Sequence, residues 1–225
     1  MPPVRSLKRK SKGPHPFASA WFTRWMPEHR SSRRLASHAP VLLTGLRAAL
    51  APVVVLLAVA WPKPAAFALC LVVAFVSDIL DGVVARRLNM ATPALRRLDS
   101  AADTVFYAAC VFAAWHLYPD AIMQRLGPLG VLALLEVTRY AVDFAKFRRE
   151  ASYHMWSSKL WGIALFAGFF GLLVLGSSGT AVSLAVYVGI IADIEGLAIT
   201  FVLPQWQSDV PSFVHALRAR RKAGF

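Results

Sequence analysis

The chain has 225 residues, of which 57% are hydrophobic and only 16% are charged, and its mean hydropathy is +0.51. This composition excludes an ordinary soluble domain, in which about a quarter of the residues are charged. The net charge is +13, but the cations lie at the two ends and in short connecting segments, which is typical of membrane orientation and not of a nucleic-acid-binding surface. The sequence therefore predicts an all-α, polytopic membrane protein with no nucleic-acid partner.

The first segment, residues 1–39, is basic and is predicted to be a cytoplasmic arm. We expect no cleavable signal peptide in it, because the first apolar run of the chain starts too late. Phe17, Trp21, Phe22 and Trp25 lie within helical reach of one another beside cationic residues. That pattern is typical of an amphipathic juxtamembrane helix lying in the headgroup layer. A disordered basic tail is the alternative.

Six apolar stretches follow the arm, each close to the ~20 residues that a helix needs to cross a bilayer. They lie near 40–60, 65–85, 100–117, 127–146, 159–176 and 180–203. Segments rich in turn-forming residues separate them. We expect six transmembrane helices that form one core over residues 40–203, followed by a basic cytoplasmic tail at 204–225.

The distribution of cations predicts the orientation of these helices. Lys and Arg concentrate in the arm, after the second and fourth stretches, and in the tail, whereas the opposite loops carry Lys63 and Arg125. Positive loops stay in the cytoplasm, so both termini are predicted to be cytoplasmic, as suits a bacterial inner membrane. The two cysteines, Cys70 and Cys110, fall inside apolar runs and predict neither a disulfide nor a zinc site.

The second and third stretches carry four aspartates at helical spacing. Asp78 and Asp81 are three residues apart and Asp99 and Asp103 are four apart, so each pair shares one helix face. A short turn between the two helices lets these faces meet at the cytoplasmic edge of the membrane. Four close carboxylates in a low dielectric require cations, and a donor set of oxygens favours Mg²⁺ or Mn²⁺, commonly as a pair of ions. A role as helix caps suits Asp99 alone, because negative charge late in a helix is disfavoured by the helix dipole.

Around these aspartates the sequence resembles the signature of the CDP-alcohol phosphatidyltransferase family, D-x2-D-G-x2-A-R-x8-G-x3-D-x3-D. Seven of its eight fixed positions are present, namely Asp78, Asp81, Gly82, Ala85, Arg86, Asp99 and Asp103. Leu95 stands where the family has its second glycine. Upstream, Thr44 and Arg47 match the family pattern of a first helix that faces the donor site. Matches at this many fixed positions are specific.

The resemblance implies an activity and a role for each of these residues. Asp78, Asp81 and Asp99 would be the main ligands of two metal ions, and Asp103 would touch metal as well and act as the general base. The donor, a CDP-activated lipid, would be bound by Thr44, Arg47, Gly82, Ala85 and Arg86. An alcohol would attack the donor and displace CMP at the cytoplasmic face. The resemblance also implies a homodimer surrounded by membrane lipids.

The segment from Ala85 to Asp103 is most similar to the phosphatidylglycerophosphate synthase version of the signature. Arg87, Asn89, Thr92 and Leu98 fit that version, whereas Leu95 and Thr104 depart from it. This similarity favours CDP-diacylglycerol as the donor and glycerol 3-phosphate as the acceptor.

Three cations are candidates for binding a phosphorylated acceptor: Arg139, Lys146 and Lys159. Positive-inside topology explains the loop cations equally well, and Glu136 lies at helical spacing to neutralise Arg139. Inositol phosphate, serine, choline and ethanolamine remain alternative acceptors. Two other classes of protein also remain open: a membrane transporter, which would place carboxylates such as Asp193 inside the membrane, and a scaffold without catalytic activity.

Overall fold

The computed structural model describes residues 30–87, 93–149, 153, 155–177 and 179–222 of the chain. Two compact units make up the chain, residues 1–38 and residues 39–225, and the second contains most of the described structure. The amphipathic helix predicted around Phe17–Trp25 lies outside the described residues.

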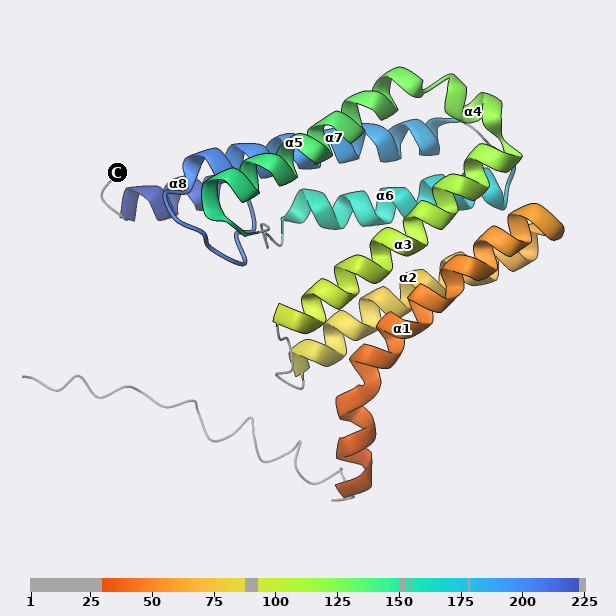
Figure 1. Cartoon of the computed structure of the whole chain (residues 1–225), viewed down its shortest axis with the longest axis horizontal. Helices are drawn as coiled ribbons and strands as arrows, with labels where there is room; N and C mark the ends of the chain where they lie inside the picture. The colour runs from red at the N-terminus through yellow and green to blue at the C-terminus, as the bar shows by residue number, and fades with distance from the viewer. Residues whose placement is uncertain (1–29, 88–92, 150–152, 154, 178, 223–225) are drawn as a thin grey trace, which may run out of the picture. The chain divides into compact units, whose positions relative to one another are not determined.

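The described residues form eight helices and no strand (Figure 1). They are α1 (Arg30–Ala60), α2 (Pro64–Arg87), α3 (Pro93–Leu117), α4 (Pro119–Met123), α5 (Leu126–Phe147), α6 (Trp156–Leu173), α7 (Thr180–Val202) and α8 (Phe213–Lys222). The predicted all-α fold is confirmed, and each of the six apolar stretches falls on a long helix. Two helices were not predicted: α4 lies in the connection after α3, and α8 lies in the basic tail.

Proline sets several of the helix boundaries. The helices α2, α3 and α4 each begin with a proline, at Pro64, Pro93 and Pro119, because the proline ring fits the first helical turn and its missing N–H would be unpaired there. The helix α5 ends where Arg148 takes a left-handed conformation with φ 54°, and α7 ends just before Pro204, which cannot continue a helix.

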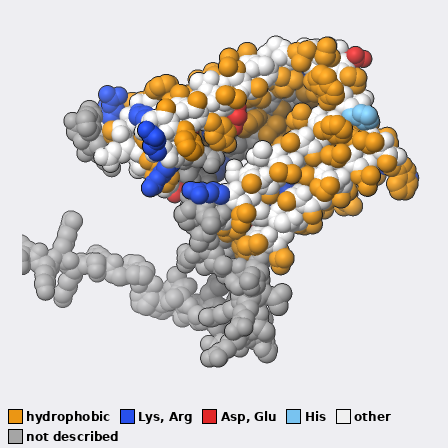
Figure 2. Space-filling view, viewed as in Figure 1, with side chains coloured by type: hydrophobic (Ala, Val, Ile, Leu, Met, Phe, Trp, Pro, Cys, Tyr) orange, Lys and Arg blue, Asp and Glu red, His pale blue; other side chains and the backbone are white. Residues whose placement is uncertain are grey.

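Four helices contain a segment that is long and apolar enough to cross a membrane. The segments are Pro40–Ala60 in α1, Pro64–Val84 in α2, Trp156–Leu173 in α6 and Thr180–Val202 in α7. Large apolar side chains also cover much of the outer surface (Figure 2), an arrangement that suits lipid and would be a liability in water. The chain is therefore an integral membrane protein.

The helices α3 and α5 do not reach the same apolar threshold. Four charged side chains interrupt α5: Glu136, Arg139, Asp143 and Lys146. In α3, Asp103 and the polar residues around it reduce the apolar length. The structure thus supports a membrane protein with four candidate spans. The two other spans expected from the sequence correspond to α3 and α5, which are more polar.

In the second unit, α6 packs against α7, α2 and α3, and α7 also packs against α5 and α8. The largest apolar cluster joins α1, α2, α3, α4 and α6, with Val54, Cys110, Ala113 and Ala114 at its centre. Small residues bring α6 and α7 close together, since a Cβ added to Gly168 would lie only 3.1 Å from the Cβ of Ala185. Close approach at small residues is a usual way for membrane helices to associate.

Candidate active site

The four aspartates of α2 and α3 lie around one side chain of α1, Arg47. The Arg47 guanidinium is 3.2 Å from Asp78 and 3.1 Å from Asp99, measured from Nη1 to the carboxylate oxygen. It also contacts the carboxylates of Asp81 and Asp103. Helical spacing explains the arrangement, because each pair of aspartates projects from one face of its own helix and the two faces meet beside α1.

Burial differs between the centre of this cluster and its edge. The side chains of Arg47 and Asp81 are only 2% and 6% exposed, whereas Asp78 is 48% exposed. Asp99 and Asp103 are about one third exposed. Arg47 and Asp81 therefore form the closed floor of the site, and the other three carboxylates line its open side.

The charges of this cluster do not balance. Among the side chains that the structure describes, four carboxylates face a single guanidinium, which is an excess of three negative charges at the edge of a low-dielectric medium. One oxygen each from Asp78, Asp99 and Asp103 lies within 4.8 Å of the others, close enough for one cation to reach all three. Carboxylate oxygens are the ligands that Mg²⁺ and Mn²⁺ prefer, so the residues present fit the divalent metal site that the sequence predicts.

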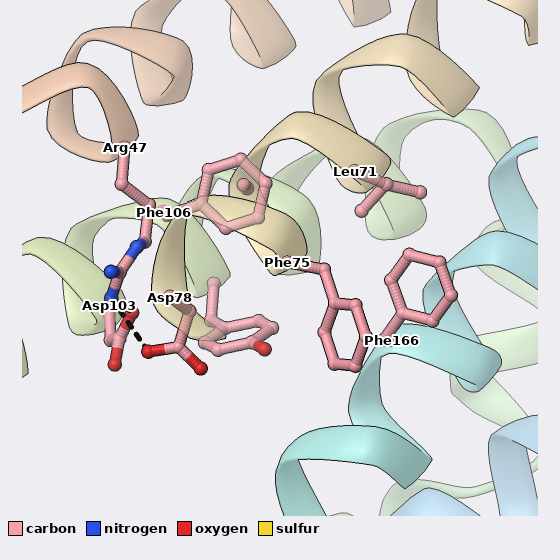
Figure 3. Close-up of a pocket in the computed structure, with 9 residues that line it drawn as sticks. Arg47, Leu71, Phe75, Asp78, Asp103, Phe106 and Phe166 are labelled. Atoms are coloured by element: carbon pink, nitrogen blue, oxygen red, sulfur yellow. Dashed lines mark hydrogen bonds and ion pairs between the residues drawn. The ribbon is translucent and has the colours of Figure 1, made fainter. Parts of the chain in front are cut away.

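A pocket opens beside these carboxylates, between α1, α2, α3 and α6. Figure 3 shows Arg47, Asp78 and Asp103 together at one end of the pocket and the rings of Phe75 and Phe166 at the other. The two rings stack with their centroids 4.5 Å apart. The pocket therefore has a charged end and an apolar end.

The residues predicted to bind the donor lie on α1 and α2. Thr44 is one turn before Arg47 and is buried, and its hydroxyl finds no hydrogen-bond partner among the described residues. Gly82 is half-buried on α2, one residue after Asp81. Ala85 and Arg86 belong to the last turn of α2, but their side chains lie outside the described part of the chain.

The three cations predicted to bind the acceptor make their contacts away from the carboxylate cluster. Arg139 pairs with Glu136 at 2.8 Å, as their spacing predicts, and with Asp193 of α7 at 3.1 Å. Lys146 donates to the backbone carbonyl of Thr200 at 2.7 Å. Lys159 is exposed and lies 4.5 Å above the Trp156 ring. Arg139 and Lys146 thus already hold partners on α7.

Sequence reasoning missed the polar contacts that line the seam between α5 and α7. Asp143 and Thr200 are both buried, and the Thr200 hydroxyl donates to Asp143 at 2.6 Å. Tyr153 lies 3.1 Å from the same hydroxyl. The spacing of Glu136, Arg139 and Asp143 on one face of a helix was the signal that could have pointed to this seam.

Comparison with known proteins places the aspartate cluster in a family context. A model of the CDP-alcohol phosphatidyltransferase family matches residues 37–202, which include all four aspartates, Thr44 and Arg47. No curated protein and no solved structure matches the chain significantly.

Proposed function

The chain belongs to the CDP-alcohol phosphatidyltransferase family, and from this premise we propose that it transfers a phosphatidyl group from CDP-diacylglycerol to an alcohol and releases CMP. The reaction would be a step of phospholipid biosynthesis. The observation that carries the proposal is the meeting of Asp78, Asp81, Asp99 and Asp103 around Arg47. A set of unbalanced carboxylates beside an apolar pocket suits a substrate that has a diphosphate next to lipid chains.

Divalent ions held by Asp78, Asp99 and Asp103, with Asp81 on the floor of the site, would polarise the diphosphate of the donor and stabilise the charge that develops on the leaving CMP. The protein itself would bind the donor and remove a proton from the acceptor. Asp103 is our choice for the general base, because it is part of the pocket lining and only one third exposed. A carboxylate there can take the proton of an attacking hydroxyl.

The donor would lie along α1 and α2. The buried and unpartnered hydroxyl of Thr44 supports this placement, because a buried hydroxyl without a partner is costly and is normally paired in the functional complex. Gly82 would let the cytidine approach α2 closely, and Arg86 would pair with a donor phosphate.

Glycerol 3-phosphate is the acceptor we propose first, on the resemblance of the segment from Ala85 to Asp103 to phosphatidylglycerophosphate synthases. Lys159 is the best placed of the three cations for its phosphate, because it is exposed and its contact within the protein is with a ring rather than with a carboxylate. Arg139 and Lys146 would have to exchange their present partners to serve the acceptor.

We further propose that α3 and α5 also cross the membrane, giving six spans over residues 40–203. Positive loops support cytoplasmic termini and a cytoplasmic active site in a bacterial inner membrane. The family resemblance supports a homodimer.

The direct test is release of CMP by the purified protein from labelled CDP-diacylglycerol in the presence of Mn²⁺. A panel of acceptors would be added singly: glycerol 3-phosphate, inositol phosphate, inositol, serine, choline and ethanolamine. We expect CMP release that depends on an added alcohol and is fastest with glycerol 3-phosphate. No release with any acceptor would contradict the proposed activity and would favour a transporter or a scaffold.

A further inference from the structure

One polar side chain of the pocket has no role in the site described so far. Of the nine described residues that line the pocket, three are charged, five are apolar, and Tyr107 is the only uncharged one with a hydrogen-bonding group. Tyr107 follows Asp103 by four residues on α3, so the two side chains project from the same face of the helix. The phenol lies within electrostatic range of both Asp103 and Asp78.

The ring of Tyr107 is held by aromatic neighbours. It stacks on Phe169 of α6 with centroids 6.0 Å apart and meets Phe106 edge to face at 5.8 Å. Aromatic pairs at these distances add to the burial of a ring and fix its orientation. The ring is therefore anchored on its apolar side, and the hydroxyl is the part left to interact with the contents of the pocket.

That hydroxyl has no hydrogen-bond partner within the part of the chain that the structure describes. The side chain is half-buried and its hydroxyl is not one of the fully buried polar atoms of the described residues, so the hydroxyl is open to the pocket that Tyr107 lines. The terminal nitrogens of the neighbouring donor, Arg47, already pair with the four carboxylates. Tyr107 is thus the neutral donor of the pocket that remains available to a bound molecule.

We propose that the Tyr107 hydroxyl donates a hydrogen bond to a phosphate oxygen of the substrate held at the carboxylates. This inference rests on the proposed function, which supplies a phosphate-bearing substrate. Phosphate oxygens are strong acceptors, and hydrogen bonds to a charged acceptor are the stronger ones. A phenol can donate such a bond without pairing with the carboxylates that would hold the metal ions.

The test is the variant Tyr107→Phe, which removes the hydroxyl and keeps the ring and its packing. Tyr187→Phe is the matched control, because it removes the same group from an exposed position on α7. CMP release would be measured with the donor varied at saturating acceptor and with the acceptor varied at saturating donor. We expect Tyr107→Phe to lower kcat/KM for one of the two substrates by about tenfold or more, as for loss of a hydrogen bond to a charged group.

The two sets of kinetic measurements identify the phosphate that Tyr107 contacts, because the substrate whose kcat/KM falls is the one that carries this phosphate. A melting temperature close to that of the wild type separates loss of a substrate contact from loss of packing. The inference is overturned if kcat/KM for both substrates stays within about twofold of wild type, a change smaller than a lost neutral hydrogen bond gives.

A second measurement needs no turnover. Binding of CDP-diacylglycerol and of glycerol 3-phosphate is detected by the shift in melting temperature that each compound produces. If the wild type binds a substrate but releases no CMP, the proposed activity fails, and weaker binding by Tyr107→Phe would still uphold the phosphate contact. Equal binding by the two proteins, or no binding by the wild type, would overturn it.

Discussion

Arg47 holds together a cluster of side chains that would otherwise repel one another. It is 1% exposed and touches all four aspartates of the site. A buried ion pair of this kind contributes little net stability, but removing one partner leaves uncompensated charge. The arginine therefore keeps the carboxylates close enough to share a cation, which independent carboxylates on separate helices would not do unaided.

The variant Asp103→Asn tests the assignment of the general base. Asparagine keeps the shape of the side chain but cannot accept a proton at the pH of the reaction, so turnover should fall by about 10²- to 10⁴-fold. The melting temperature should remain near that of the wild type. CMP release and thermal unfolding of the purified protein measure the two quantities.

Asp120→Asn is the control for this substitution, because Asp120 is exposed in the first turn of α4 and takes no part in the cluster. It should keep the turnover of the wild type. If Asp103→Asn stays fully active, another group takes the proton and the assignment is wrong.

Contacts with α7 accommodate the charged residues of α5. Contacts recur between residues 57 positions apart along the chain: Asp143 accepts from Thr200, and Arg139 would touch a Cβ added at Gly196. Charged and polar groups inside a membrane are tolerated when they pair with one another. The seam thus explains how a helix with four charged residues can pack against the apolar helix α7.

Thr200→Val should destabilise the seam. Valine has the size of threonine but neither donates to Asp143 nor accepts from Tyr153, contacts of 2.6 and 3.1 Å in the wild type. Loss of buried hydrogen bonds of this kind costs about 1–3 kcal/mol, which thermal or chemical unfolding in detergent would measure. Thr138→Val is the control: Thr138 is exposed on α5 and bonds only a backbone carbonyl of its own helix, so its loss should change stability by less than about 0.5 kcal/mol. Equal stabilities of the two variants would mean that the hydrogen bonds of Thr200 add no stability of their own.

Gly189 lets α7 approach α6 and α5 closely. A Cβ at Gly189 would lie 2.6 Å from Nε1 of Trp161 and 3.0 Å from a methyl group of Leu132. Gly189→Ala should therefore cost about 1–3 kcal/mol through overpacking. Gly162→Ala, where nothing lies within 4 Å of the added Cβ, should instead stabilise its helix by up to about 1 kcal/mol. Melting temperatures that shift in the same direction would contradict this account of the packing.

The surface of the protein divides into apolar sides and a basic end. Exposed apolar side chains cover the helices, and Lys and Arg gather where α5 ends and α8 lies (Figure 2). Arg148, Arg149, Arg218, Arg220 and Arg221 are all exposed there. Such an asymmetry supports the proposal that this end faces the cytoplasm.

Cysteine labelling tests the orientation. Cys70 and Cys110 are buried, at 5% and 0% exposure, so the native thiols should react little with a membrane-impermeant maleimide. In intact cells Lys63→Cys should be labelled from outside, and Arg220→Cys should be labelled only after permeabilisation. The opposite pattern would reverse the topology and place the carboxylate site on the other side of the membrane.

Much of the architecture could be predicted because it is local in the sequence. Apolar runs of the right length gave the six long helices, and the spacing of Asp78 with Asp81 and of Asp99 with Asp103 gave two acidic faces. Contacts that depend on tertiary register could not be predicted: spacing does not reveal that Arg47 reaches all four carboxylates or that Thr200 meets Asp143. The helix α8 was missed because its basic composition resembles a tail, whereas in the structure Ala216 is buried against Leu203 and Val210.

We propose that the aspartates of α2 and α3 together hold divalent cations, and the activity of the site depends on this. The test is to measure Mn²⁺ binding to the detergent-solubilised protein, using the electron paramagnetic resonance signal of the free ion. It needs no assumption about the substrate. We predict saturable binding to the wild type and to Asp120→Asn, and loss of most of this binding when Asp78→Asn and Asp99→Asn are combined. Unchanged Mn²⁺ binding by the double variant would contradict the claim.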